Sequence, residues 1–210
     1  MILLDVDGTA VGWGDYHQRY FSLMSKAYGM CGGSGLTIEE GDEIFFESDS
    51  LLRERKIDPE RFWNVLEKVD MTERLRSARS GDLGAYEDTS ALYRLTVEGI
   101  HYAWITNLPY AVATATLSAC GLENPAVIGG NYRGHKPDGG RVRREMAVHQ
   151  IPDACALVGN TDVDMQTALA LDVPGILVNR SGNGYNGPEP YCAIDSLHGL
   201  PEVLKKLQLL

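Results

Sequence analysis

Short apolar runs alternate with segments of helical periodicity over most of the chain from about residue 86 onward. The run Met1-Ile2-Leu3-Leu4 is apolar at every position, which predicts a strand buried on both faces. Later apolar runs predict strands at 100–105, 126–128, 154–158 and 176–178, and the remaining segments predict helices at 90–98, 109–120, 141–149, 165–171 and 200–210. Such alternation is typical of βαβ units, with parallel strands and right-handed crossovers. Thr89-Ser90 can cap the first of these helices, and Pro109 suits the first position of the second.

Residues 12–85 differ, because they show helical periodicity without a convincing strand. Asp15 can cap a helix that runs to Tyr28, Thr37-Ile38-Glu39-Glu40 matches a capping box, and Asp58-Pro59-Glu60 is a start signal for a helix to Val69. We therefore predict an α/β fold, a doubly wound parallel sheet of about five strands with helices on both faces, formed by residues 1–11 and 85–210. An all-helical domain at 12–84 is inserted after the first strand.

Composition and charge narrow the range of functions. Hydrophobic residues make up 44% of the 210 and charged residues 23%, which is ordinary for a globular protein. The formal net charge of −10 argues against a general nucleic-acid binder, which needs a basic face, and against binding to anionic membranes. We expect a cytoplasmic protein without a signal peptide, because the chain opens on a strand and its four cysteines form no C-x-x-C pair.

Polar residues follow four of the predicted strands. Asp5 and Asp7 come directly after the first, with Gly8 to turn the chain, and Thr106-Asn107 follow the second. Lys136 lies after the third strand, and the segment 159–164, Gly-Asn-Thr-Asp-Val-Asp, follows the fourth. The carboxyl ends of parallel strands share one edge of a doubly wound sheet, so these residues are expected to converge there. Two acids this close require a cation or a proton, which is the setting for a metal-assisted nucleophile paired with an acid/base.

These four motifs in this order, with a helical insertion after the first, resemble the haloacid dehalogenase-like (HAD) superfamily, in the helical-cap branch that includes phosphoglycolate phosphatase. The resemblance covers the whole core: D-x-D-G-T, an apolar strand ending in Thr, Lys-Pro, and G-N-T-x-x-D. It implies an Mg²⁺-dependent phosphatase that hydrolyses a small phosphate monoester through an aspartyl-phosphate, and phosphoglycolate phosphatase-like activity is the best single expectation.

The resemblance also implies a role for each motif. Asp5 is expected to be the nucleophile, Asp7 the general acid and then the base, and Lys136 the cation that neutralises the phosphoryl group. Substrate-binding and metal-binding roles fall on two further sets. Gly8, Thr106 and Asn107 are expected to contact the phosphoryl group, and Asp5, the Asp7 carbonyl, Asn160 and Asp164 to hold Mg²⁺.

One position departs from the family pattern, since Asn160 stands where these proteins usually carry Asp. An amide oxygen can still ligate Mg²⁺ but brings no charge, so we expect weaker metal binding. Two alternatives therefore stay open: a phosphomutase or other phosphotransferase of the same fold, and a degenerate protein that binds a phosphorylated ligand without catalysis. Dehalogenation needs no second acid, so Asp7 argues against it.

The expected partner is a small phosphorylated metabolite, with neither nucleic acid nor membrane, and the expected state is a monomer or homodimer. The helical insertion determines the substrate and is the hardest part to interpret. Polar residues early in it and three later arginines can face a cleft, but each is more simply a solvated helix residue: Tyr16, His17, Arg19, Arg53, Arg55 and Arg61.

Overall fold

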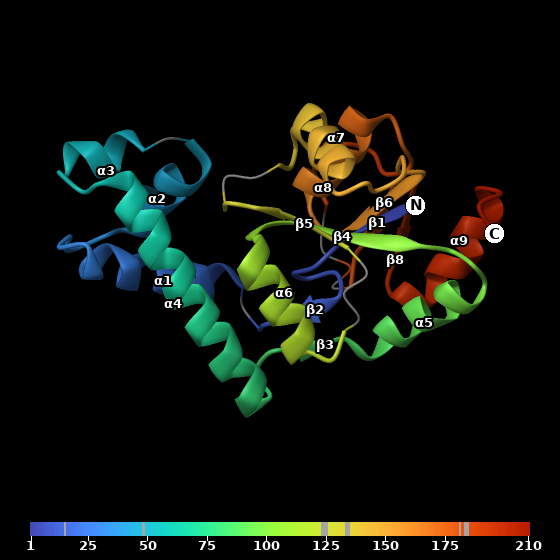
Figure 1. Cartoon of the computed structure of the whole chain (residues 1–210), viewed down its shortest axis with the longest axis horizontal. Coiled ribbons are helices and arrows are strands. Elements are labelled where there is room, and N and C mark those ends of the chain that lie inside the picture. The colour runs from blue at the N-terminus through green and yellow to red at the C-terminus, as the bar shows by residue number, and fades with distance from the viewer. Residues whose placement is uncertain (15, 48, 123–125, 133–134, 181, 183–184) are drawn as a thin grey trace. The chain divides into compact units, whose positions relative to one another are not determined.

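The structure is a computed structural model that describes the chain apart from residues 15, 48, 123–125, 133–134, 181 and 183–184 (Figure 1). It divides into two compact units, one formed by Met1–Gly12 with Gly84–Leu210 and the other by Trp13–Leu83. Within the described residues, no helix combines the length and the apolar character that a membrane span requires.

A six-stranded parallel sheet forms the centre of the first unit, in the order β5-β4-β1-β6-β7-β8. Its strands are β1 (Ile2–Asp5), β4 (Tyr102–Pro109), β5 (Val127–Gly130), β6 (Ala156–Gly159), β7 (Gly175–Val178) and β8 (Cys192–Ile194). From β1 the chain continues to β4 on one side, whereas from β6 it continues to β7 on the other. The strand order therefore reverses between the neighbours β1 and β6, where open α/β sheets bind ligands at their carboxyl ends.

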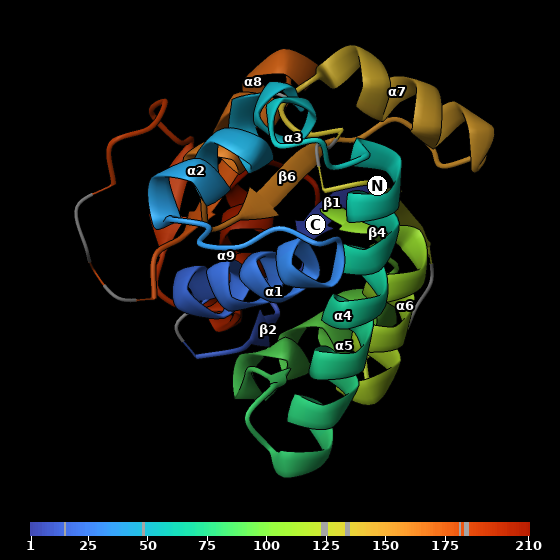
Figure 2. The ribbon, with the colours of Figure 1, turned by 90° about the vertical axis from the view of Figure 1, so that its left-hand side faces the viewer.

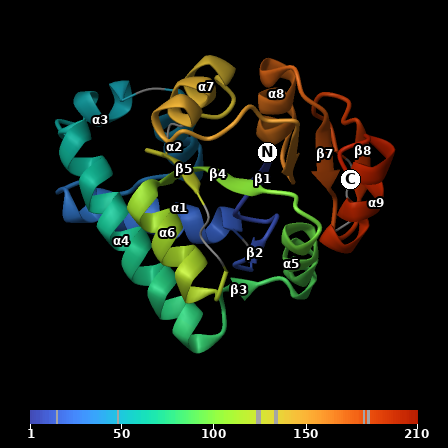
Figure 3. The same ribbon diagram turned by 45° about the vertical axis from the view of Figure 1, so that its right-hand side comes forward.

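Helices cover both faces of this sheet. In Figures 1 and 3, α7 (Gly139–Val148) and α8 (Asp162–Leu171) lie on one face, and α5 (Ser90–Val97) and α6 (Tyr110–Ala119) lie on the other. Strand side chains alternate in direction, and one set packs against α7 and α8 in a buried core. That core contains Leu3, Ala103, Ile105, Ile128, Val142, Met146, Leu157, Met165, Ala168, Leu171 and Leu177. The last helix of the unit is α9 (Leu200–Lys206).

The second unit is helical, with α1 (Tyr16–Met30), α2 (Ile38–Asp42), a π-helical turn (Glu43–Glu47), α3 (Ser50–Glu54) and α4 (Pro59–Ser80). Figure 2 shows α1 lying across α4, and the two helices are in contact. The predicted capping box at Thr37 is present, and Asp58 accepts a hydrogen bond from the Glu60 amide at the start of α4. Helix α4 ends at Gly81, whose φ of 81° is left-handed.

The predicted fold class is confirmed, and the structure corrects several details. The sheet has six strands rather than about five, because the edge strand β8 is only three residues long and too short to be recognised as an apolar run. A two-stranded antiparallel ribbon, β2 (Val11–Gly12) with β3 (Gly84–Ala85), was also missed. Helix α4 continues beyond Val69 to Ser80. The sequence did not predict this continuation, because the buried face there carries the polar residues Asp70, Arg74 and Ser77 in place of apolar ones.

Helix α5 begins at Ser90 as predicted, but two of the predicted start signals act differently. Thr89 makes no capping hydrogen bond, and its hydroxyl donates instead to the carbonyl of Tyr86 because a 3₁₀ turn, Glu87–Thr89, precedes α5. Pro109 is the last residue of β4 rather than the first of α6, since the strand continues beyond Ile105. The predicted cap at Asp15 lies outside the described residues.

Candidate active site

The site begins with the sharp turn after β1. Asp5 is the last residue of that strand and is buried, with 5% of its surface exposed. The amides of Ala10 and Val11 both donate to the carbonyl of Val6, which closes the loop that carries Asp7. Gly8 has a φ of 79°, and a Cβ built there would lie only 2.2 Å from the side-chain amide of Asn160. Glycine is therefore required both by the backbone and by the close approach of the fourth motif.

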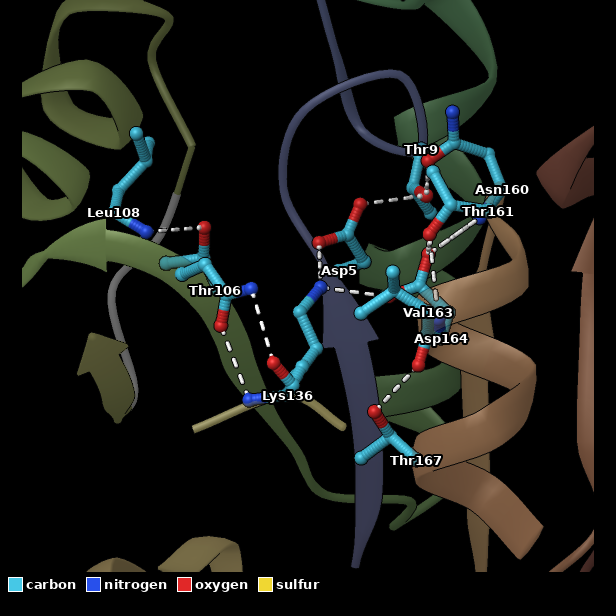
Figure 4. Close-up of polar contacts among 11 residues, drawn as sticks. Asp5, Thr9, Thr106, Leu108, Lys136, Asn160, Thr161, Val163, Asp164 and Thr167 are labelled. Atoms are coloured by element: carbon cyan, nitrogen blue, oxygen red, sulfur yellow. Dashed lines mark hydrogen bonds and ion pairs between the residues drawn. The ribbon is translucent and has the colours of Figure 1, made fainter. Parts of the chain in front are cut away.

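Lys136 lies between two carboxylates on different elements, as Figure 4 shows. Its Nζ is 2.5 Å from Asp5 Oδ1 and 2.6 Å from Asp164 Oδ1, and all three side chains are buried. Burial alone lowers the pKa of Lys136, but the nearby Asp164 and Asp5 carboxylates raise it overall. The lysine therefore remains a cation, and it joins motifs that are 131 and 28 residues away in the chain.

Asn107 holds the backbone of Lys136 in place. Its Oδ1 accepts a hydrogen bond from the Lys136 amide at 3.0 Å, and its Nδ2 donates to the Lys136 carbonyl at 3.3 Å. The neighbouring Thr106 is buried, and its hydroxyl oxygen accepts from the amide of Leu108 at 3.2 Å. Asn107 was predicted to contact the phosphoryl group, whereas these two hydrogen bonds position the lysine; the phosphoryl contact stays a prediction.

Asp164 fixes the start of α8 as well as Lys136. Its Oδ2 accepts from the amides of Asn160 and Thr161, both at 3.0 Å, and from the Thr161 hydroxyl at 2.7 Å. Thr161 accepts in return from the Asp164 amide, which completes a capping box. Both oxygens of Asp164 are thus engaged with protein donors.

Asn160 meets the β1 loop at the same edge. One terminal atom of its side-chain amide lies 3.1 Å from Thr9 Oγ1, 3.0 Å from the Asp7 carbonyl oxygen and 3.2 Å from Asp5 Oδ2. The Thr9 hydroxyl also lies 3.1 Å from Asp5 Oδ2. The first and last motifs therefore meet side by side, across the boundary between β1 and β6.

The electrostatics of the site are unbalanced. Burial and the Asp164 carboxylate raise the pKa of Asp5 to about 7, although Lys136 opposes this shift. One lysine thus faces two carboxylates within hydrogen-bonding distance. A further positive charge at this edge would stabilise the ionised form of Asp5.

The oxygens around Asn160 are of the kind that a hard divalent cation prefers. Mg²⁺ takes an octahedron of oxygens at about 2.1 Å, so neighbouring ligands lie about 3 Å apart, and a few protein ligands suffice when waters and phosphate complete the shell. The distances from the Asn160 side chain to the Asp7 carbonyl and to Asp5 Oδ2, 3.0 and 3.2 Å, match that spacing. Among the described residues no three His, Cys, Asp or Glu side chains cluster as a metal site, and the candidate ligands here are one carboxylate, a backbone carbonyl and a side-chain amide. The residues present fit Mg²⁺ on these terms.

Of the residues expected at the site, Asp5, Lys136, Asn160 and Asp164 are brought together directly. Asp7 contributes its backbone carbonyl to the same cluster, and Gly8 packs on Asn160. The roles assigned to these residues, including metal binding by Asp164 and phosphoryl contacts by Gly8 and Thr106, stay predictions.

Sequence reasoning missed residues that support the β1 loop. Thr9 follows Gly8 directly, and its position in D-x-D-G-T was the signal that could have indicated its hydrogen bond to Asp5. Arg180 donates to the Thr9 carbonyl at 2.6 Å, pairs with Asp88 at 2.6 and 3.0 Å and lies 3.9 Å from the centre of the Tyr86 ring. No local pattern marks Arg180, because its partners are distant in sequence.

The fold and this edge define a class: a doubly wound α/β protein with a helical insertion, in which carboxylates and a lysine converge at the switch point of the sheet. Comparison with protein-family models gives no match. The sequence is 32% identical over 127 residues to a plasmid-borne phosphoglycolate phosphatase of Cupriavidus necator, a match that spans 57% of this chain and about half, 55%, of that relative.

Solved structures share the fold over nearly the whole chain. CbbY from Rhodobacter sphaeroides, in complex with phosphate, has a TM-score of 0.70 at 17% identity and covers 95% of each chain. A HAD phosphatase from Thermococcus onnurineus has a TM-score of 0.61 at 20% identity, over 97% of this chain and 96% of its own. The predicted resemblance to HAD-type phosphatases is therefore confirmed at the level of the fold, which the chain shares with these structures.

Proposed function

We propose that this protein is an Mg²⁺-dependent phosphatase that hydrolyses a small phosphate monoester through an aspartyl-phosphate at Asp5. The observation that carries the proposal is Lys136 Nζ held between Asp5 and Asp164 at the switch point of the sheet. A buried carboxylate next to a lysine, with an excess of negative charge, suits a nucleophile that must receive a phosphoryl group. The partial match to a phosphoglycolate phosphatase supports the same reaction class.

The first step transfers the phosphoryl group to the protein. A carboxylate oxygen of Asp5 attacks phosphorus, the bond from phosphorus to the ester oxygen breaks, and Asp7 donates its proton to that oxygen. In the second step Asp7 takes a proton from water, the water oxygen bonds to phosphorus, and the bond to Asp5 breaks. Lys136 neutralises charge on Asp5 and on the phosphoryl oxygens throughout.

For Mg²⁺ we propose Asp5 Oδ2, the Asp7 carbonyl and the Asn160 side-chain oxygen as ligands. When bound, the ion supplies charge neutralisation and orientation of the phosphoryl group. Asp164 was expected to be a fourth ligand. Because both of its oxygens accept hydrogen bonds from the protein, we propose instead that it positions Lys136 and the loop at Asn160.

The substrate class we propose is a small phosphorylated metabolite, with phosphoglycolate as the first compound to test, and the expected location is the cytoplasm. The test measures phosphate release from phosphoglycolate, sugar phosphates, nucleotides and p-nitrophenyl phosphate, with and without Mg²⁺. Turnover that requires Mg²⁺ and disappears in Asp5→Asn supports the proposal. Phosphate binding without turnover of any of these compounds would favour a degenerate binding protein, and phosphoryl transfer between sugar hydroxyls would favour a phosphomutase.

A further inference from the structure

The amide of Asn160 stands among atoms that accept hydrogen bonds. The Asp7 carbonyl has no proton to donate, and the Asp5 carboxylate accepts a hydrogen bond from Lys136. The Thr9 hydroxyl has a single proton, and it donates that proton to Asp5 Oδ2 at 3.1 Å. An amide oxygen turned toward this group would therefore face lone pairs. The reverse orientation satisfies all of them, with Nδ2 3.0 Å from the Asp7 carbonyl, 3.1 Å from Thr9 Oγ1 and 3.2 Å from Asp5 Oδ2.

The same position suits an oxygen when a cation is bound. Distances of 3.0 and 3.2 Å from the Asp7 and Asp5 oxygens are those of an N–H···O hydrogen bond, and they are also close to the edge of an Mg²⁺ octahedron. Nitrogen and cation cannot face each other, since the amide nitrogen has protons and no free lone pair for a metal. Either the Asn160 amide nitrogen or the cation can therefore bind the Asp5 and Asp7 oxygens, but not both at once.

We propose that the Asn160 amide takes the place of the cation: its nitrogen holds the Asp5 and Asp7 oxygens together until Mg²⁺ binds, and the side chain then turns to present its oxygen. This inference rests on the proposed function for the identity of the ion. Aspartate at position 160 has no proton to donate, and it would add a third carboxylate to Asp5 and Asp164 around one lysine. Asn160 therefore keeps the site assembled without the ion, at the expense of ion affinity.

The test compares thermal unfolding of the full-length protein with that of Asn160→Asp, in a chelator and in saturating MgCl₂. In chelator we expect the variant to unfold at least about 3 °C below the parent, the shift typical for losing one hydrogen-bonded contact in a chain of this size. Mg²⁺ should then raise the midpoint of the variant by more than it raises that of the parent. Gln208→Glu, an exposed position far from this edge in sequence, adds the same charge and should show neither effect. Equal midpoints in chelator, or equal Mg²⁺ shifts, would overturn the inference.

A second measurement on the parent protein does not depend on the folding of a variant. The side-chain NH₂ of Asn160 gives a pair of signals in a ¹⁵N–¹H spectrum, identified by their loss in Asn160→Asp or Asn160→Ser. These protons should exchange slowly with water in chelator and faster, with a changed chemical shift, in MgCl₂. Fast exchange in chelator, or no response to the ion, would contradict the proposal. Neither readout uses turnover, so an inactive protein with these signatures would sink only the proposed function.

Discussion

Lys136 at the edge of the sheet and Arg74 in helix α4 are both buried cations that contact carboxylates. Arg74 Nε donates to Asp70 Oδ1 at 2.8 Å within the same helix, four residues away, and its guanidinium lies 4.5 Å from the centre of the Trp13 ring. Lys136 instead contacts two carboxylates from separate elements, one at the end of β1 and one in the first turn of α8. The helical pair joins two residues one turn apart in the same helix, whereas the sheet-edge cluster brings a lysine and two carboxylates together from distant parts of the chain. Burial of a charge is therefore poor evidence of function, and the convergence of buried charges from distant segments is better evidence.

Replacing Asp5 should give the largest effect on activity. Asp5→Asn keeps the shape of the side chain but removes the nucleophile, so kcat should fall by more than about 10⁴-fold, as it does when a covalent nucleophile is lost. Steady-state hydrolysis of p-nitrophenyl phosphate with Mg²⁺ measures this, and circular dichroism checks folding. A folded variant that keeps a tenth of the activity would exclude Asp5 as the nucleophile.

Replacing Asp70 should act on stability instead. Asp70→Asn removes the carboxylate charge that faces the buried Arg74 guanidinium, so the free energy of unfolding should fall by about 3 kcal/mol. Urea denaturation measures the loss, and turnover per folded molecule should stay within a few-fold of the parent. The contrast between the two clusters breaks down if this variant is as stable as the parent but inactive.

The pH dependence of stability should report on Asp5 in the sheet-edge cluster. The pKa of Asp5 is raised from 3.8 to about 7 in the folded protein, so the folded state binds the proton more tightly than the unfolded chain. The stabilisation from this group is full below pH 3.8 and is lost as the pH rises through about 7. In chelator, the parent should therefore lose stability relative to Asp5→Asn between pH 5 and pH 8. Parallel melting curves for the two proteins across that range would show that Asp5 titrates normally.

Asn160→Asp should have the smallest effect on activity, and it tests whether residue 160 binds Mg²⁺. A carboxylate at this position adds a charged ligand, so the Mg²⁺ concentration for half-maximal activity should fall several-fold, on the order of 1 kcal/mol. Titration of activity with MgCl₂ gives the comparison. An unchanged or higher requirement would count against ligation from residue 160.

Much of the first unit followed from local pattern. Apolar runs located its central strands, and the rule that parallel strands share a carboxyl edge was enough to bring Asp5, Lys136 and Asp164 together from the sequence alone. Contacts made by polar residues over long distances were not predictable in the same way. Arg180 donates a hydrogen bond to the Thr9 carbonyl from 171 residues away. The hydrogen bond between the Asn107 side chain and the Lys136 amide depends on a loop geometry that no periodicity encodes.

In the helical unit, too, local interactions could be predicted from the sequence and buried polar contacts could not. Its capping residues Thr37 and Asp58 mark helix starts because capping is a local interaction. The full length of α4 was missed because Asp70 and Arg74 pair with each other on the buried face, where apolar residues are expected. Polar residues that satisfy one another inside a protein are invisible to a pattern based on hydrophobicity.

The central claim is that Asp5 carries the phosphoryl group during turnover, and trapping that group tests it most directly. In Asp7→Asn the base for the second step is missing, while p-nitrophenol leaves readily without an acid. After mixing this variant with p-nitrophenyl phosphate and Mg²⁺, rapid acid quenching and peptide mass spectrometry should find one phosphoryl group on the peptide that contains Asp5. Release of a full equivalent of p-nitrophenol with the phosphoryl group on another residue, or with none on the protein, would contradict the account.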